Sequence, residues 1–281
     1  MFKRLSNSWE LVKASWRVLL ADKELMIFPV VAFIASTIVT ITFAVPTVLA
    51  GLLDSAVSNG EINVFSYIVA FLFYAAMYFV TIFANSALVG AAMIRLEGGD
   101  PTVRDGFRIA FERLGTILGY AVIAATVGTI LRMVSERSGA LGRFVVSLVG
   151  FAWNIATFLV VPVLVVEKVG PMEAVKRSAN LLKDTWGEQI AGNLSVGFVF
   201  GLVYLLVTLV GIPLIILAVL SNSVALIVTA VALLALVYVA VALIQSTLSG
   251  IYIAAVYRFA TTGDTGGYFE ADMVKDAFKL K

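Results

Sequence analysis

The sequence contains no cysteine and no histidine among its 281 residues. Disulfide bonds, thiol nucleophiles and thiolate metal sites are therefore excluded, as are zinc sites and Ser–His pairs that depend on imidazole. The long apolar stretches also contain no aspartate on which an intramembrane aspartyl chemistry would depend. We predict that no residue is catalytic, and we expect neither a metal nor a cofactor.

Charge is scarce as well, since only 14% of the residues are Asp, Glu, Lys or Arg, against about 25% in soluble domains. The uncharged runs cover residues 25–53, 62–94, 114–131, 144–166 and 189–257. A helix of roughly 20 apolar residues crosses a hydrocarbon core, and backbone amides in lipid must pair within the segment. The last run is too long for one crossing, and Ser221-Asn222-Ser223 divides it. We therefore predict an all-α polytopic membrane protein with six transmembrane helices in three hairpins.

The cations are placed unevenly along this six-span chain. Seventeen of the 20 Lys and Arg residues fall on one side, in segments 1–24, 95–113, 167–188 and 258–281. Cytoplasmic loops of membrane proteins collect Lys and Arg, so we expect a multi-pass protein of the inner membrane with both termini in the cytoplasm. The same side carries 15 of the 18 acidic residues, and for that reason we expect no binding to nucleic acid.

A basic hexapeptide occurs twice, as VRDGFR at 103–108 after the second span and as VKDAFK at 274–279 after the sixth. Comparable segments precede the first and fifth spans, so each hairpin is flanked by a basic amphipathic segment. The chain is therefore predicted to be a single integral membrane domain built of repeats. Its pseudo-repeats cover 1–95, 96–167 and 168–258, and an amphipathic cytoplasmic tail covers 259–281.

The basic segments have the spacing of helices that lie in the plane of the membrane surface. In the first, apolar residues three or four positions apart share one predicted face, which comprises Phe2, Leu5, Trp9, Val12, Trp16 and Leu19. In the second, Asp100 is the predicted N-cap and Pro101 the first helical residue. Helices of this kind lie apolar face down among anionic headgroups. The alternative is that they only pack under the bundle and anchor it.

Five residues are predicted to contact lipid headgroups. Arg95 and Arg258 each stand where a span meets the cytoplasm, and arginine grips a phosphate with two donors. Indole rings favour the headgroup level, which suggests the same position for Trp9, Trp16 and Trp186. The expected partners are membrane lipids, in particular anionic ones. The alternative for both arginines is an ion pair with a nearby acid such as Glu97 or Asp264.

The spans contain few polar groups, among which the amides are Asn85, Asn154 and Gln245. They are predicted to form hydrogen bonds between helices, and the alternative is that they line a path through the membrane. Glycines four residues apart let helix backbones approach closely, as predicted for Gly115–Gly119 and Gly197–Gly201. We favour packing within the chain, with a homo-oligomer as the alternative.

The three-hairpin layout, the segment VKRSANLLKDTW (175–186) and the segment YRFATTGD (257–264) carry a resemblance. They resemble an uncharacterised prokaryotic family of six-span proteins, known as a domain of unknown function. More distantly, the chain is similar to the membrane-anchoring domain of some bacterial glycerophosphodiester phosphodiesterases. The resemblance implies an integral inner-membrane protein, and it does not imply the phosphodiesterase activity, because no histidine exists to supply that chemistry.

The leading functional hypothesis is a non-enzymatic, membrane-organising or lipid-interacting scaffold whose working surface is formed by the basic amphipathic helices. The second is a passive carrier or channel for a small solute or lipid, with a path between the hairpins near Asn154 and Gln245. An enzyme that uses phosphate chemistry at the cytoplasmic interface comes third.

The cation distribution makes a prediction that labelling tests. A cysteine introduced at Ser138 should react with a membrane-impermeant thiol reagent in intact cells, whereas one at Ser6 should react only after the membrane is permeabilised. The natural absence of cysteine removes any background. Labelling at Ser6 but not at Ser138 in intact cells would reverse the orientation.

Overall fold

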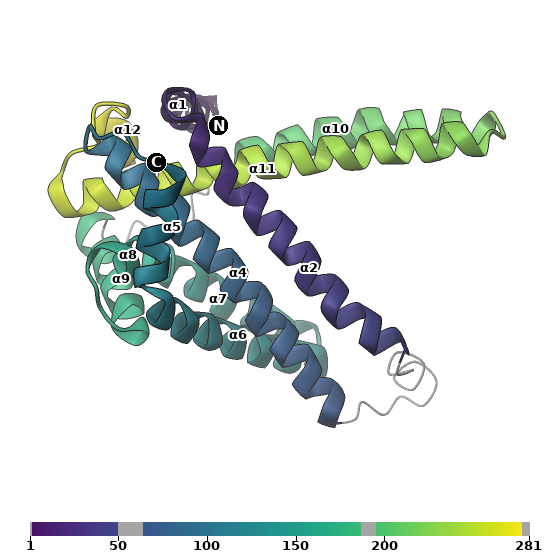
Figure 1. Ribbon diagram of the computed structural model, residues 1–281, viewed down its shortest axis with the longest axis horizontal. Helices are drawn as coiled ribbons and strands as arrows, with labels where there is room; N and C mark the ends of the chain where they lie inside the picture. Colours follow the sequence, from purple (N-terminus) through teal and green to yellow (C-terminus); the bar gives the residue numbers. More distant parts are fainter. Residues whose placement is uncertain (1, 50–63, 187–194, 277–281) are drawn as a thin grey trace. The chain divides into compact units, whose positions relative to one another are not determined.

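The computed structural model describes residues 2–49, 64–186 and 195–276, and all the regular structure in these ranges is helical (Figure 1). The prediction of an all-α fold is therefore confirmed. Along the chain lie α1 (Phe2–Ala21), the 3-10 turn η1 (Lys23–Met26), α2 (Ile27–Leu49), α4 (Val64–Leu96), α5 (Val103–Glu112), α6 (Leu114–Arg137), α7 (Ala140–Ala156), α8 (Val160–Val166), α9 (Pro171–Trp186), α10 (Ser195–Leu220), α11 (Val224–Thr262) and α12 (Ala271–Asp276).

Six segments of the described chain are long and apolar enough to cross a membrane. They are Lys23–Val48, Ile68–Leu96, Leu114–Arg137, Ala140–Val166, Val196–Leu220 and Val224–Thr262. The last two are separated by a turn at Ser221 and Asn222, as predicted. Asn222 has a left-handed φ of 54°, which asparagine tolerates better than most residues. The prediction of six apolar spans is confirmed, and the chain has the features of a multi-pass membrane protein.

The fourth span is not one continuous helix, because a turn at 157–159 separates α7 from α8. Pro162 has no N–H, and its ring would collide with the carbonyl of Phe158 in a continuous helix, so the break lies just before it. The N–H of Leu159, which has lost its helical acceptor, donates to Ser178 Oγ on α9 over 3.0 Å. A side chain of the neighbouring helix α9 thus accepts the hydrogen bond of a backbone N–H group that the break leaves without a helical partner.

The described residues form two compact units. Unit 1 comprises Met1–Met26, Ala92–Asp100 and Trp186–Lys281, and unit 2 comprises Ile27–Ala91 and Pro101–Thr185. The boundary divides α4 after Ala91, so each unit contains part of this helix. The units do not follow the three predicted pseudo-repeats, although a short helix followed by two long spans does recur along the chain.

In unit 1, α1 packs against both helices of the α10–α11 hairpin (Figure 1). No residue of α11 from Val224 to Ser246 is buried, whereas most residues from Thr247 to Tyr257 are. The uncovered part is about 35 Å long at 1.5 Å per residue, close to the hydrocarbon thickness of about 30 Å. The uncharged run is longer than a bilayer because protein covers its second part.

The same change of character occurs along α4. None of residues 68–81 is buried, whereas Ile82 and most residues after it are. In both helices the buried part lies next to a segment rich in Lys and Arg. We call the end of a span that adjoins such a segment its basic end. A charge-free run therefore records burial in lipid and burial in protein alike, and its length overstates the membrane-spanning part.

In unit 2, aromatic rings hold α5 against two spans. Phe107 meets Phe28 of α2 edge-on, with ring centres 5.2 Å apart, and Phe111 meets Phe83 of α4 in the same way at 5.0 Å. Edge-on pairs of this kind contribute about 0.5–1.5 kcal/mol beyond the area they bury. Phe111 is nevertheless 62% exposed, so α5 keeps an apolar edge at the surface.

The first hexapeptide begins a helix, but the N-cap is Thr102 and not the predicted Asp100. Thr102 Oγ1 accepts the N–H of Asp105, and the Asp105 carboxylate accepts the N–H of Thr102 over 3.1 Å, which forms a reciprocal capping box. Pro101 consequently lies before the helix. Of the second hexapeptide, Val274–Asp276 belongs to α12 and the remainder lies outside the described residues.

The glycine of the first hexapeptide allows a close approach that a substitution tests. A Cβ at Gly106 would lie 2.7 Å from the Ala87 carbonyl oxygen and would overlap the ring of Phe28. Gly106→Ala should therefore destabilise the protein by about 1–3 kcal/mol through overpacking. In the control Gly115→Ala, nothing lies within 4 Å of the added Cβ, and alanine favours a helix by up to about 1 kcal/mol.

Thermal unfolding of the two variants in the same detergent measures the difference. Equal stability of Gly106→Ala and Gly115→Ala would show that α5 does not pack closely on α4.

Candidate functional site

At the basic end of unit 1, Arg95 on the last turn of α4 bridges two carboxylates. Its Nε and Nη2 each lie 3.2 Å from Asp22 Oδ2, and Nη2 lies 2.5 Å from Asp100 Oδ1. The side chain of Asp22, between α1 and η1, is 6% exposed, whereas that of Asp100 is 94% exposed. The guanidinium group therefore joins the end of α1 to the end of α4, with one partner inside the protein and one in solvent.

Arg258, near the end of α11, forms a second cluster with acids. Its Nη2 and Nε lie 2.7 Å and 3.2 Å from Asp264 Oδ2, and its Nη1 lies 3.9 Å from Glu97 Oε1. Asp264 Oδ1 accepts the backbone N–H groups of Thr265 over 2.8 Å and of Gly266 over 3.2 Å. Asp264 thus fixes the guanidinium group to the turn that follows α11.

That turn rests on the end of α4. Gly266 has a φ of 72°, and a Cβ at this position would overlap the carbonyl group of Leu96, so only glycine fits. Arg17 of α1 donates from Nη2 to the carbonyl oxygen of Tyr268 over 3.0 Å. The end of α1, the end of α4 and the turn after α11 are therefore joined within unit 1.

The carboxyl groups of the two clusters differ in pKa. Burial raises the pKa of Asp22 above its ordinary value, and the hydrogen bond and charge of Arg95 offset only part of this effect. The hydrogen bond from Arg258, with help from the N–H of Gly266, lowers the pKa of Asp264. Both arginines form ion pairs with acids. For Arg258 the partners are Glu97 and Asp264, the two acids named above as the alternative to a lipid headgroup.

The three predicted interfacial tryptophans lie in different surroundings. Trp186 is 5% exposed; its indole N–H donates to the Val274 carbonyl over 3.4 Å, and its ring centre lies 6.1 Å from that of Phe259. The prediction of a headgroup contact is therefore corrected for Trp186, because α11 and α12 cover it. Trp9 and Trp16 remain 49% and 40% exposed.

The two exposed tryptophans belong to one face of α1. Spacings of four, three and four residues place four side chains on this face, which we call the tryptophan row: Trp9, Lys13, Trp16 and Leu20. Lys13 and Leu20 are 51% and 54% exposed, and Lys13 Nζ lies 5.9 Å from the centre of the Trp9 ring.

The opposite face of α1 is the buried one, and it comprises Leu11, Ala14 and Val18. The single apolar face predicted from Phe2 to Leu19 is therefore corrected from Trp9 onward, and the side chains of Phe2 and Leu5 lie outside the described ones. Val12 and Leu19, which were placed on it, are buried, whereas the tryptophans are not.

The predicted intramembrane amides are also less central than expected. Asn154 is exposed on α7, and Asn85 on α4 and Gln245 on α11 are half-buried. The prediction of a hydrogen bond between helices is therefore not confirmed for Asn154, whose side chain is exposed. The α10–α11 hairpin instead contains a polar contact that the sequence did not single out, a hydrogen bond between the hydroxyl groups of Thr208 and Tyr238.

Most of the predicted glycine pairs do not mediate packing within the chain. Gly115, Gly197 and Gly201 are exposed, and a Cβ at Gly115 or Gly201 would meet nothing within 4 Å. Gly119 does lie against another helix, since its Cβ would stand 2.8 Å from Pro171 Cγ of α9. Of the four glycines, Gly119 is therefore the one that the structure places against another helix of the chain, and the other three are exposed.

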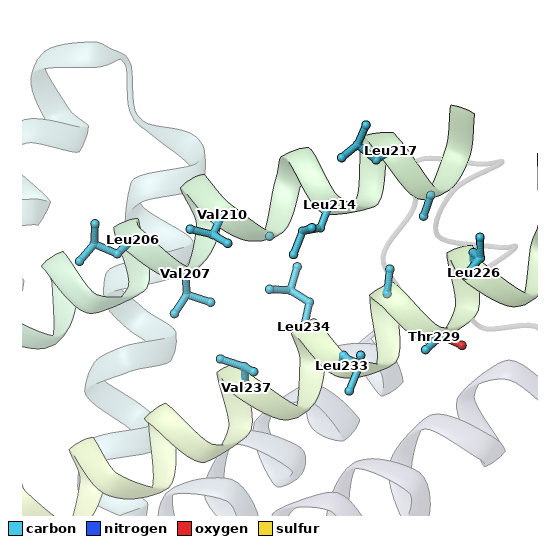
Figure 2. A pocket seen from close by; sticks show the side chains of 13 residues that line it. Leu206, Val207, Val210, Leu214, Leu217, Leu226, Thr229, Leu233, Leu234 and Val237 are labelled. Atoms are coloured by element: carbon cyan, nitrogen blue, oxygen red, sulfur yellow. The ribbon is translucent and has the colours of Figure 1, made fainter. Parts of the chain in front are cut away.

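An apolar groove of about 740 Å³ lies between α10 and α11. Leu214 and Leu234 point toward each other across it, and Thr229 is its one hydroxyl-bearing lining residue (Figure 2). The lining contains no charged side chain. Such a groove suits hydrocarbon and offers nothing to hold a polar solute.

A family model described as "Family of unknown function (DUF6159)" matches residues 64–268, from the start of α4 to the turn after α11. The protein belongs to this family of unknown function. No curated protein and no solved structure matches the chain. The match includes Arg95 and Arg258 with their exposed partners, whereas Asp22 and the tryptophan row precede it. The resemblance to phosphodiesterase membrane domains finds no support in these comparisons.

Asp22 of the Arg95 cluster, and Lys13 and Leu20 of the tryptophan row, are residues that the sequence did not single out. Asp22 is separated from Arg95 by 73 positions, so no local spacing reveals the pair. One signal was present, since Asp22 stands between the basic segment and the first uncharged run. An acid next to an apolar span indicates that a cation of the chain lies close to it.

The buried ion pair predicts a pH-dependent loss of stability. Arg95→Ala would leave the Asp22 carboxylate buried without its partner, which costs about 3–5 kcal/mol. The pKa of Asp22 is raised in the folded state, so the folded protein binds its proton more readily than the unfolded chain does. The loss measured at pH 7 should therefore shrink as the pH falls toward about 4.

Arg177→Ala is the control, because Arg177 pairs with Glu167 at 2.9 Å and is itself 43% exposed. Exposed pairs contribute at most about 1 kcal/mol. Unfolding of both variants is to be followed at several pH values. A loss for Arg95→Ala that grows on acidification would contradict the buried pair.

Proposed function

We propose that the protein is a non-enzymatic, lipid-interacting scaffold that organises the membrane at the basic ends of its spans. The observation that carries this proposal is the tryptophan row. Two indoles, a leucine and a lysine lie exposed on the face of α1 opposite its buried face. An isolated exposed apolar residue is ordinary, but a row that runs from Trp9 to Leu20 along one face of α1 indicates a surface that something covers.

The chemistry of the row suits a bilayer surface. Indoles favour the headgroup level, where the ring meets apolar tails and the N–H meets water. Leu20 supplies a side chain for the hydrocarbon, and Lys13 adds a cation worth about 1 kcal/mol beside anionic lipid. Because α1 also packs on α10 and α11, the row is fixed to two spans and does not bind as a free peptide would.

The basic ends are proposed to face the cytoplasm, as the cation distribution suggests. The proposed partners are anionic lipids of the inner membrane, and a homo-oligomer is compatible with the exposed Gly197 and Gly201. We assign the first contact with anionic lipid to the tryptophan row, since Arg95 and Arg258 are each held by carboxylates. The absence of histidine and cysteine supports a non-enzymatic role.

The groove between α10 and α11 favours a second candidate, a carrier of lipid. Its apolar lining is compatible with an acyl chain and offers no charged group to a small polar solute. Identification by mass spectrometry of lipid that stays bound in mild detergent tests this candidate. Loss of that lipid on Ala230→Leu, which fills the groove, would support it, whereas retention would reject it.

The scaffold proposal is tested in nanodiscs of phosphatidylcholine with or without one third phosphatidylglycerol. The anionic lipid should raise the midpoint of thermal unfolding of the natural protein. Replacement of the row by Trp9→Ala, Lys13→Gln and Trp16→Ala should remove at least half of that rise, because the indoles and the cation no longer hold the surface.

Met172→Ala serves as the control, since Met172 is 54% exposed on α9, outside the row. It should keep the full rise. If the row variant responds to anionic lipid as fully as the natural protein does, the row is not the lipid contact and the proposal fails.

A further inference from the structure

The two carboxylates that hold Arg95 differ in how firmly they are fixed. Asp22 is enclosed by protein, whereas the side chain of Asp100 is 94% exposed. Among the described residues, Arg95 is the one side chain that pairs with Asp100. Asp22, the inner partner, is therefore fixed by the surrounding protein, whereas Asp100, the outer partner, is held only by its contact with Arg95.

Arg258 provides the comparison within the same unit. Its exposed partner Asp264 also follows a span end, but two backbone N–H groups, from Thr265 and Gly266, bind the other carboxylate oxygen. Removal of Asp264 from Arg258 would break these bonds and undo the turn. Removal of Asp100 from Arg95 would cost only the ion pair itself.

We propose that Arg95 is an exchangeable anion site, in which Asp100 stands in for a phosphate group and leaves when one arrives. This inference rests on the proposed lipid contact and adds a second, regulated site to it. A phosphodiester carries the same single negative charge as the carboxylate it replaces, so the charge of the cluster does not change. Arginine also binds phosphate with two parallel donors, which a single aspartate oxygen does not use.

Position and burial favour exchange over simple opening. Arg95 lies on the last turn of α4, next to the segments rich in Lys and Arg, where a phosphate group can reach its exposed side. Its side chain is only 17% exposed, and a guanidinium group removed from water needs a partner for each side that faces out. Asp22 contacts both Nε and Nη2 on the inner side, and Nη2 also meets the outer position, where either Asp100 or a phosphate completes the pair.

Asp100→Asn tests the exchange, with Asp264→Asn as the matched control. Asp100→Asn should at least double the rise in unfolding temperature that phosphatidylglycerol produces in phosphatidylcholine nanodiscs, because the competing carboxylate is gone. Asp264→Asn should lower stability in both lipids and leave the rise unchanged. Adding Arg95→Lys to Asp100→Asn keeps a cation beside Asp22. It should nevertheless cancel the increased response to phosphatidylglycerol, because lysine lacks the two parallel donors that bind phosphate.

A further arm adds inorganic phosphate to the Asp100→Asn variant in phosphatidylcholine. A rise that matches the effect of phosphatidylglycerol assigns the site to free phosphate, and no rise assigns it to the lipid headgroup. An equal lipid response from Asp100→Asn and the natural protein, with no phosphate effect, overturns the inference. The tryptophan-row variant distinguishes the lipid contact of the row from the anion site at Arg95. It removes the contact on α1, and adding Asp100→Asn to it should still increase the response to phosphatidylglycerol.

Discussion

The ion pair between Asp22 and Arg95 is the constraint on which the basic end of unit 1 depends. A carboxylate with 6% of its side chain exposed cannot remain charged without a cation, and Arg95 is that cation. The pair fixes the junction of α1 and η1 to the last turn of α4. The turn after α11 then packs on the Leu96 carbonyl, next to Arg95, and Arg17 of α1 binds the same turn. Three segments that are distant in the sequence therefore meet around one buried ion pair.

The fold was largely predictable because a helix that crosses a bilayer needs a long run of uncharged residues, and such runs are visible in the composition alone. Five uncharged runs, the last of them divided in two, yield six apolar helices, and even the turn at Ser221 and Asn222 followed from its polar residues. The extent of each span was not predictable. Hydropathy rises equally when a side chain faces lipid and when it faces protein, so the buried part of α11 from Thr247 to Tyr257 reads as membrane. The division of the chain into two units left no trace in the pattern either.

The candidate site was predictable only where it is local. Arg95 and Arg258 each precede an aspartate by a few residues, and both of these contacts form. The rotation of α1 about its axis was not readable, because both of its faces carry apolar residues. Leu11, Ala14 and Val18 match the 3.6-residue period as well as the tryptophans do, and only contact with α10 and α11 decides which set is buried. Trp186 was misplaced for the same reason, since an indole near a span end suits a headgroup and a protein core equally.

The two surfaces at the basic end of unit 1 differ in what they can contribute. The tryptophan row is apolar and aromatic with one cation, so the binding proposed for it would combine the apolar area that it buries with the attraction of Lys13 to anionic headgroups. The arginine clusters are polar and nearly closed, and their carboxylates outnumber their guanidinium groups. A strongly basic patch would hold any anionic surface, whereas a guanidinium group already paired with Asp22 accepts an anion only in place of another anion. In the proposed scaffold, the tryptophan row would attach the protein to the bilayer and Arg95 would add an exchangeable anion site, and the Asp22–Arg95 pair joins the end of α4 to the segment that follows α1.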